Sequence, residues 1–244
     1  NYDAFMEPIS WFLTGMEKHS DARRNDLRGN ASAFFGSMTD YGARFTTPSA
    51  LVAMNELSNH DHSRFLTRTN HVVGRTAFAG PQAANYGVNL AVMRQAVLMQ
   101  MTWVGAPTIY YGDEAGVCGW TDPDNRRSYP WGKEDHELIR IHKDYEVFST
   151  GSLLYLHAEN NLIGYGRFNE KEQAFVLVQV EGEEREVEVD VWRLGVANGC
   201  RMACMMYTCQ EGFDMAARMC RVENGKVKVE IGKNGAVLWK TLSM

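Results

Sequence analysis

The sequence lacks the features that mark membrane-spanning and nucleic-acid-binding proteins. No apolar run approaches the about 20 residues that a helix needs to cross a bilayer. The 244 residues carry a formal net charge of −5, and their basic side chains form no stripe. An acidic chain of this kind is repelled by phosphate backbones and by anionic membrane surfaces. These absences predict no nucleic-acid or membrane partner and favour a neutral, weakly polar ligand.

The cysteines lack the spacing of a metal site or of a disulfide framework. There are five of them, an odd number, with no CxxC pair and no histidine pair nearby. We therefore expect neither a zinc site nor a disulfide scaffold, and we expect the cysteines to be free thiols. Free thiols favour a reducing compartment and predict a cytoplasmic location, with a secreted or cell-associated one left open. The cysteines are Cys118, Cys200, Cys204, Cys209 and Cys220.

The first residues, Asn1-Tyr2-Asp3, are neither a start methionine nor a signal peptide, so we expect a piece of a longer protein. Its 45% hydrophobic content is enough for one large core or two modest ones.

Hydrophobic spacing changes partway along the chain. Apolar residues at helical spacing predict helices at 5–13, with a stop at Gly15, at 90–101 and at 136–142, the last including His136. Apolar runs at 51–57 and 106–111 predict strands on either side of the middle helix, which makes a βαβ unit. Beyond Gly151 the period becomes two, and strands at 174–180, 186–191 and 226–231 predict an antiparallel β-sandwich. We therefore expect a boundary near residue 150.

Polar side chains follow the first predicted strand at once, in Asn55-Glu56-Leu57-Ser58-Asn59-His60-Asp61-His62-Ser63-Arg64. Loops beyond the carboxyl ends of parallel strands commonly hold functional groups, because the sheet fixes the loop while its side chains stay open to a ligand. His60 and Asp61 are therefore the leading candidates for a functional site.

The second predicted strand also ends in polar residues, and a loop rich in charge comes after it. Gly112-Asp113-Glu114 closes the strand, and Gly119-Trp120-Thr121-Asp122-Pro123-Asp124-Asn125-Arg126-Arg127 follows.

At these residues the chain resembles the α-amylase family of retaining glycoside hydrolases, in its neopullulanase and cyclomaltodextrinase branch. Asn59-His60-Asp61 is similar to the family motif at the end of barrel strand seven. Residues 105–114 are similar to strand eight, and 122–126 to the loop after it. The resemblance implies that residues 1–150 are the last third of a (β/α)8 barrel, strands six to eight, and that 151–244 are the family's C-terminal β-sandwich domain.

The resemblance also implies roles for individual side chains. Asp61 would stabilise the transition state by accepting hydrogen bonds from two ring hydroxyls, and His60 would donate to the same sugar. Asp122 and Arg126 would bind a neighbouring glucose unit, while Tyr111 and Trp120 would stack on sugar faces. No cofactor is implied, and no metal is assigned because the calcium-binding loops of some relatives are absent.

The family's nucleophile and general acid stand on strands four and five, and no Gly-x-Arg-x-Asp pattern occurs in this sequence. The resemblance thus implies that the complete protein hydrolyses α-1,4 or α-1,6 glucosidic bonds in maltooligosaccharides, cyclodextrins, pullulan or starch, and that this chain alone is inactive. Its expected partners are an α-glucan and the missing N-terminal part of the barrel, because a partial barrel leaves open sheet edges.

Several alternatives stay open. His60 and Asp61 could instead cap a following helix, Asp122 and Arg126 could be a plain surface ion pair, and the aromatic residues could be packing. Asp113 and Glu114 could line the site or only brace the loop, and Arg64 could hold Asp61 by charge. His62 departs from the threonine of many relatives. For the complete protein, a non-catalytic carbohydrate-binding or scaffold relative and a transglycosylase are the rival functions.

Overall fold

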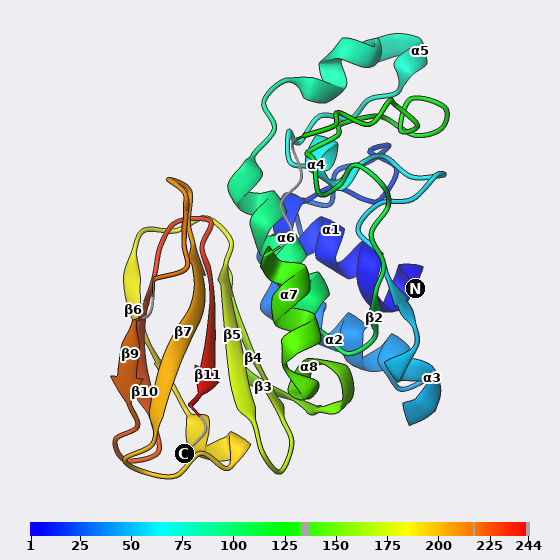
Figure 1. Ribbon diagram of the computed structural model, residues 1–244. Helices are drawn as coiled ribbons and strands as arrows, with labels where there is room; N and C mark the ends of the chain where they lie inside the picture. The colour runs from blue at the N-terminus through cyan, green and yellow to red at the C-terminus, as the bar shows by residue number, and fades with distance from the viewer. Residues whose placement is uncertain (133–136, 217, 243–244) are drawn as a thin grey trace.

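The computed structural model describes residues 1–132, 137–216 and 218–242, without the side chains of 137 and 138. Helices dominate the first part and strands the second (Figure 1). The helices are η1 (Tyr2–Met6), α1 (Glu7–Thr14), α2 (Ala31–Gly42), α3 (Thr47–Leu51), α4 (Phe65–Arg68), α5 (Thr76–Ala79), η2 (Pro81–Asn85), α6 (Leu90–Thr102), α7 (Glu137–Asp144), α8 (Glu146–Thr150) and η3 (Val191–Leu194). The strands are β1 (Met54–Asn55), β2 (Ala106–Pro107), β3 (Ser152–Glu159), β4 (Leu162–Phe168), β5 (Gln173–Gln179), β6 (Arg185–Val189), β7 (Arg201–Thr208), β8 (Phe213–Asp214), β9 (Met219–Arg221), β10 (Val227–Ile231) and β11 (Ala236–Thr241).

The three predicted helices are present. α1 ends where Gly15 takes the left-handed conformation, φ 66°, which a residue without Cβ adopts at little cost. α6 begins at Asn89, whose side chain accepts a hydrogen bond from the Ala91 backbone N–H at 2.9 Å. α7 matches the third prediction, whose first residue, His136, lies outside the described residues.

The apolar residues whose spacing predicts α6 are not all buried on one face of the helix. Met93, Leu98 and Met101 are buried, but Leu90 is 57% exposed at the first turn. Ala91, Ala96 and Gln95 on other faces are buried too, because α6 packs between α1 and the large sheet. A helix surrounded by neighbours has no single apolar stripe.

The strands on either side of α6 pair in parallel, as the βαβ prediction requires, but they are much shorter than predicted. Met54 lies opposite Ala106 and Asn55 opposite Pro107, and residue 51 belongs to α3 instead. Gln100 braces the end of the ladder, because its side-chain amide donates to the carbonyls of Asn55 and Thr108 at 2.9 Å each, beside the backbone bond from the Thr108 N–H to the Asn55 carbonyl. This pair is the only parallel pairing within the described residues, so a barrel stays a proposal.

The antiparallel strands predicted beyond Gly151 are confirmed. Seven strands form one sheet in the order β3-β4-β5-β11-β7-β8, with β9 paired to β7, and β10 and β6 form a second sheet. In β5, Phe175 and Leu177 face the second sheet, whereas Ala174, Val176 and Val178 belong to the core shared with the helices. Burial on both faces explains why this strand is an unbroken apolar run while β6 and β10 alternate.

The helices and the large sheet pack directly on each other (Figure 1). Gln95 of α6 donates to the carbonyls of Gln179 and Gly235, and Arg167 of β4 donates to those of Thr102 and Gly151. All five cysteines are free, as expected. Among the described residues, no helix combines the length and the apolar character that crossing a bilayer demands.

Candidate functional site

The two predicted site loops leave the same end of the parallel pair. One follows β1 and the other follows β2, and parallel strands present their carboxyl ends at one edge of a sheet. The fold therefore places the candidate residues of both loops side by side.

Asn59 shapes the first loop. Its side-chain Oδ1 accepts hydrogen bonds from the backbone N–H groups of Asp61 at 2.9 Å and His62 at 3.1 Å. This turn leaves the side chains of His60 and Asp61 60% and 57% exposed, with His60 Nε2 3.4 Å from Asp61 Oδ1. Neither residue caps the following helix, because the Phe65 N–H at its start donates to Ser58 Oγ. The capping alternative is excluded.

The second loop carries the predicted ion pair and touches the first. Arg126 Nε donates to Asp122 Oδ1 at 2.5 Å, and Arg126 Nη2 donates to the His60 carbonyl at 3.4 Å. Both side chains of the pair are about half exposed. The structure thus brings together four of the six predicted site residues: His60, Asp61, Asp122 and Arg126.

Asn125 fastens the two loops together, a role that the sequence reasoning missed. Its Nδ2 donates to the carbonyls of Asn59 at 3.1 Å and His62 at 2.7 Å, and the residue is fully buried. Loss of these two bonds would leave buried polar groups without partners, which costs free energy. Asn125 therefore fixes the position of one loop relative to the other. A small polar residue between two charged ones, within a loop already singled out, was the only signal available.

Arg64 lies fully buried beneath both loops. Its Nε donates to the Asn125 carbonyl at 2.9 Å and its Nη1 to the Tyr111 carbonyl at 2.7 Å. Nη1 also pairs with Asp113 at 3.0 Å, and the guanidinium lies 4.0 Å from the Tyr110 ring centroid. Arg64 is therefore structural, and the alternative in which it holds Asp61 by charge is wrong, because its carboxylate partner is Asp113. Asp113 braces the loop.

Burial raises the pKa of Asp113 to about 6, because the loss of water outweighs the opposing effect of Arg64. A carboxyl whose pKa is higher when folded than when unfolded binds more protons in the native state, so its contribution to stability is present below pH 4 and lost as the pH rises through 6. We expect the difference in unfolding free energy between the wild type and Asp113→Asn to fall from pH 4 to pH 6.5, as measured by urea unfolding. A difference that grows with pH would contradict this sign.

The two predicted aromatic residues differ in position. Tyr111 is 39% exposed, and its hydroxyl donates to the Arg127 carbonyl at 2.9 Å, next to Arg126. Trp120 is fully buried, with its ring against Gly74 and its Nε1 donating to the Gly80 carbonyl at 3.0 Å. A ring without exposed faces cannot stack on a sugar, so the binding role predicted for Trp120 is corrected to packing.

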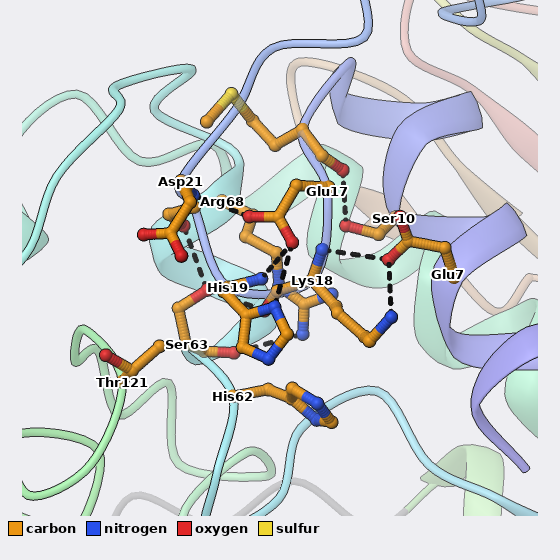
Figure 2. A network of polar contacts seen from close by, with 12 residues as sticks. Glu7, Ser10, Glu17, Lys18, His19, Asp21, His62, Ser63, Arg68 and Thr121 are labelled. Atoms are coloured by element: carbon orange, nitrogen blue, oxygen red, sulfur yellow. Dashed lines mark hydrogen bonds and ion pairs between the residues drawn. The ribbon is translucent and has the colours of Figure 1, made fainter.

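A loop between α1 and α2, residues 16–23, supports the first site loop from behind (Figure 2). Ser63 N–H donates to the Lys18 carbonyl at 3.2 Å, and the hydroxyls of Ser20 and Ser63 are 2.9 Å apart. The ring of His19 packs edge-on against that of His62, with 4.6 Å between the ring centroids. Burial, with nearby His19 and Arg68, lowers the pKa of His62 to about 3, so this residue is a neutral support.

The same loop contains the one group of side chains, among the described residues, whose positions could suit a metal ion: Glu17, His19 and Asp21. Their ligand atoms already have partners. Glu17 accepts from the N–H groups of His19 and Asp21 (Figure 2). Asp21 is paired with Arg75. The group is satisfied without a metal.

The exposed side chains suit a neutral polyhydroxylated ligand. Two carboxylates accept hydrogen bonds from hydroxyl groups, and a guanidinium and an imidazole donate them. The buried groups beneath hold them in place, which reduces the entropy lost on binding.

Comparison with known proteins gives this site a context. No protein-family model matches the chain. It is 33% identical over 218 residues to an amylopullulanase of Thermoanaerobacter thermohydrosulfuricus, covering 80% of this chain and 14% of that protein. It is 31% identical over 173 residues to neopullulanase 2 of Thermoactinomyces vulgaris, covering 66% of this chain and 27% of that protein. The solved structure of a cyclomaltodextrinase covers 99% of the chain with a TM-score of 0.72 and 22% identity.

The chain spans 14% to 27% of these two curated relatives and 36% of the solved cyclomaltodextrinase chain. The structural likeness shows a shared fold, and the sequence matches carry the relationship. The chain belongs to the α-amylase family of glycoside hydrolases, among the members that resemble neopullulanase, cyclomaltodextrinase and amylopullulanase.

Proposed function

We propose that this chain supplies one side of the active site of a retaining α-glucan hydrolase, with Asp61 as the transition-state-stabilising carboxylate. One observation carries the proposal: Asp61 stands exposed on a turn that buried groups hold rigidly, within one site with His60, Asp122 and Arg126. A solvent-facing carboxylate on a preorganised turn suits a binding role, because little reorganisation is needed when a ligand arrives.

The chemistry explains what Asp61 would do. Cleavage of a glycosidic bond passes through a flattened ring with positive charge at its anomeric carbon. Hydrogen bonds from two ring hydroxyls to the Asp61 carboxylate would strengthen as that ring reshapes, and each is worth about 1.5–3 kcal/mol. Such bonds raise turnover more than they raise ground-state affinity.

The neighbouring groups would position the glucan. His60 would donate to the sugar that Asp61 binds, and Asp122 with Arg126 would hold the next glucose unit through its hydroxyls. Tyr111 lies at the edge of the same loop and would offer its ring to a sugar face. The bond cleaved would be α-1,4 or α-1,6, in maltooligosaccharides, cyclodextrins, pullulan or starch.

The nucleophile and the general acid would come from other sequence. A retaining enzyme needs two carboxyl groups about 5–5.5 Å apart. In this proposal residues 1–150 are the last third of a (β/α)8 barrel and residues 151–244 are the C-terminal β-sandwich domain packed on it, and the remaining barrel strands carry both groups. The parallel pair β1–β2 and the likeness to the cyclomaltodextrinase structure support this arrangement.

The first test asks whether the 244-residue chain alone hydrolyses a glucan. We expect no release of glucose or maltose from maltotriose by the chain alone, because both reacting carboxyl groups are elsewhere. Glucose-release assays with the chain and with the native protein that carries it make the comparison. Measurable turnover by the chain alone would overturn the division of the site.

Binding tests the second loop. In the native protein, Arg126→Met should weaken acarbose binding about tenfold or more, because a charge-assisted hydrogen bond is worth about 1.5–3 kcal/mol. Arg44→Met is the matched control, since Arg44 forms an exposed pair at 2.8 Å with Asp40 of α2, outside both site loops. Equal affinities for the two variants, measured by calorimetry, would leave Asp122 and Arg126 as a plain surface pair.

The rival functions predict other results. A scaffold relative would bind acarbose but hydrolyse nothing even as the native protein. A transglycosylase would release longer maltooligosaccharides from maltotriose, which chromatography of the products separates from hydrolysis.

A further inference from the structure

Tyr2 lies at the candidate site, in contact with the first site loop. It opens helix η1 and is 41% exposed. Its hydroxyl accepts a hydrogen bond from Asn59 Nδ2 at 3.1 Å, and its ring packs edge-on against His62 at 4.8 Å. The phenol therefore contacts residues on both sides of Asp61 in the first site loop.

Glu56 fixes this arrangement from below. It is 8% exposed, and its Oε1 accepts from the same Asn59 Nδ2 at 3.1 Å. Asn59 thus uses its amide nitrogen on Glu56 and Tyr2 and its amide oxygen on the N–H groups of Asp61 and His62. One side chain therefore sets the position of the Tyr2 hydroxyl and that of Asp61 together.

The phenol keeps its proton. Burial raises the pKa of Tyr2 from 10, and the negative charges of Glu56 and Asp61 raise it further. Within the described part of the chain the hydroxyl has Asn59 as its hydrogen-bond partner, and that bond uses its oxygen as acceptor. Its own proton is available to a ligand.

We infer that Tyr2 is a substrate-binding residue that donates its hydroxyl proton to the glucose unit held by Asp61, and that Glu56, through Asn59, is the residue that positions it. The inference rests on the proposed function and extends it to a wall of the site built from η1. A neutral donor beside a carboxylate acceptor matches a sugar hydroxyl, which both donates and accepts.

The chemistry also limits the effect of losing Tyr2. A hydrogen bond between neutral groups contributes less than one to a charged group, so Tyr2→Phe should cost less than loss of Asp61. The ring of Phe keeps the edge contact with His62, and only the hydroxyl is removed. Glu56→Gln keeps the shape and removes the charge that helps to orient Asn59.

The test measures acarbose binding to the native protein by calorimetry. We expect Tyr2→Phe to weaken binding about three- to tenfold, and Glu56→Gln to weaken it by a smaller factor. Tyr41→Phe on α2 is the control and should bind like the wild type, because Tyr41 lies away from both site loops and stacks with Arg44.

A spectroscopic readout distinguishes contact from a merely structural effect. With tyrosine labelled at ¹³Cζ, the Tyr2 signal, identified by its loss in Tyr2→Phe, should shift when acarbose is added, while the Tyr41 signal should stay in place. Unchanged affinity in Tyr2→Phe, or a Tyr2 signal that does not move, overturns the role of Tyr2 and leaves the proposed function standing. Failure of the wild type to bind acarbose overturns both.

Discussion

Asp61→Asn in the native protein should lower kcat on maltotriose by at least about a hundredfold and leave KM within a few-fold of the wild type. Replacing a carboxylate acceptor of two hydroxyl donors with an amide removes about 3–6 kcal/mol of charge-assisted hydrogen bonding. Because those bonds strengthen in the transition state, the loss falls on turnover, and about 1.4 kcal/mol corresponds to each factor of ten.

The fold should not change in this variant. Asp61 is exposed, and its backbone N–H, which does bond to Asn59, is unaffected by the substitution. Asp40→Asn provides the control, since Asp40 is also an exposed acid, lies on α2 and pairs with Arg44. Steady-state kinetics on maltotriose make the measurement. A wild-type kcat in Asp61→Asn would contradict the proposed role of Asp61.

Arg64→Met should lower the free energy of unfolding by about 3–5 kcal/mol, because it leaves the buried Asp113 carboxyl without its cation. The same change removes the donors to the carbonyls of Tyr111 and Asn125 and the contact with the Tyr110 ring. Urea unfolding followed by tryptophan fluorescence measures the loss.

Arg44→Met is a matched control for this effect. Arg44 also pairs with an aspartate, at 2.8 Å, and also lies over a tyrosine ring, at 4.5 Å, but its side chain is 64% exposed. Exposed pairs contribute about 0–1 kcal/mol, so the control should unfold almost like the wild type. Adding Asp113→Asn to Arg64→Met should recover part of the loss. If Arg64→Met and Arg44→Met lowered the unfolding free energy equally, burial would not determine how much each ion pair contributes.

Local sequence was enough to find the site loops. Polar side chains placed directly after short apolar runs drew attention to Asn59, His60 and Asp61, and to the charged loop around Asp122 and Arg126. Those signals depend on neighbours in sequence, and the structure puts the two loops together. The helices and the antiparallel strands were predicted for the same reason, since their periodicity is local.

Long-range contacts account for what was missed or wrong. Trp120 is buried by Gly74 and Gly80, which lie at least 40 residues away in sequence. The role of Asn125 depends on carbonyls more than 60 residues earlier. Gln100, whose side-chain amide donates to the Asn55 carbonyl at the end of the parallel pair, lies 45 residues from Asn55 in sequence. None of these partners is visible from the spacing of residue types.

The two hydrogen bonds by which Asn125 joins the site loops matter for protein engineering. Loops after barrel-type strands are attractive units for grafting between relatives, because they can be exchanged without touching the sheet. Here a graft of residues 59–62 or of residues 122–126 alone would replace one half of the contact between the Asn125 amide and the two backbone carbonyls that it bridges. The transplantable module is the pair of loops with Arg64 beneath them.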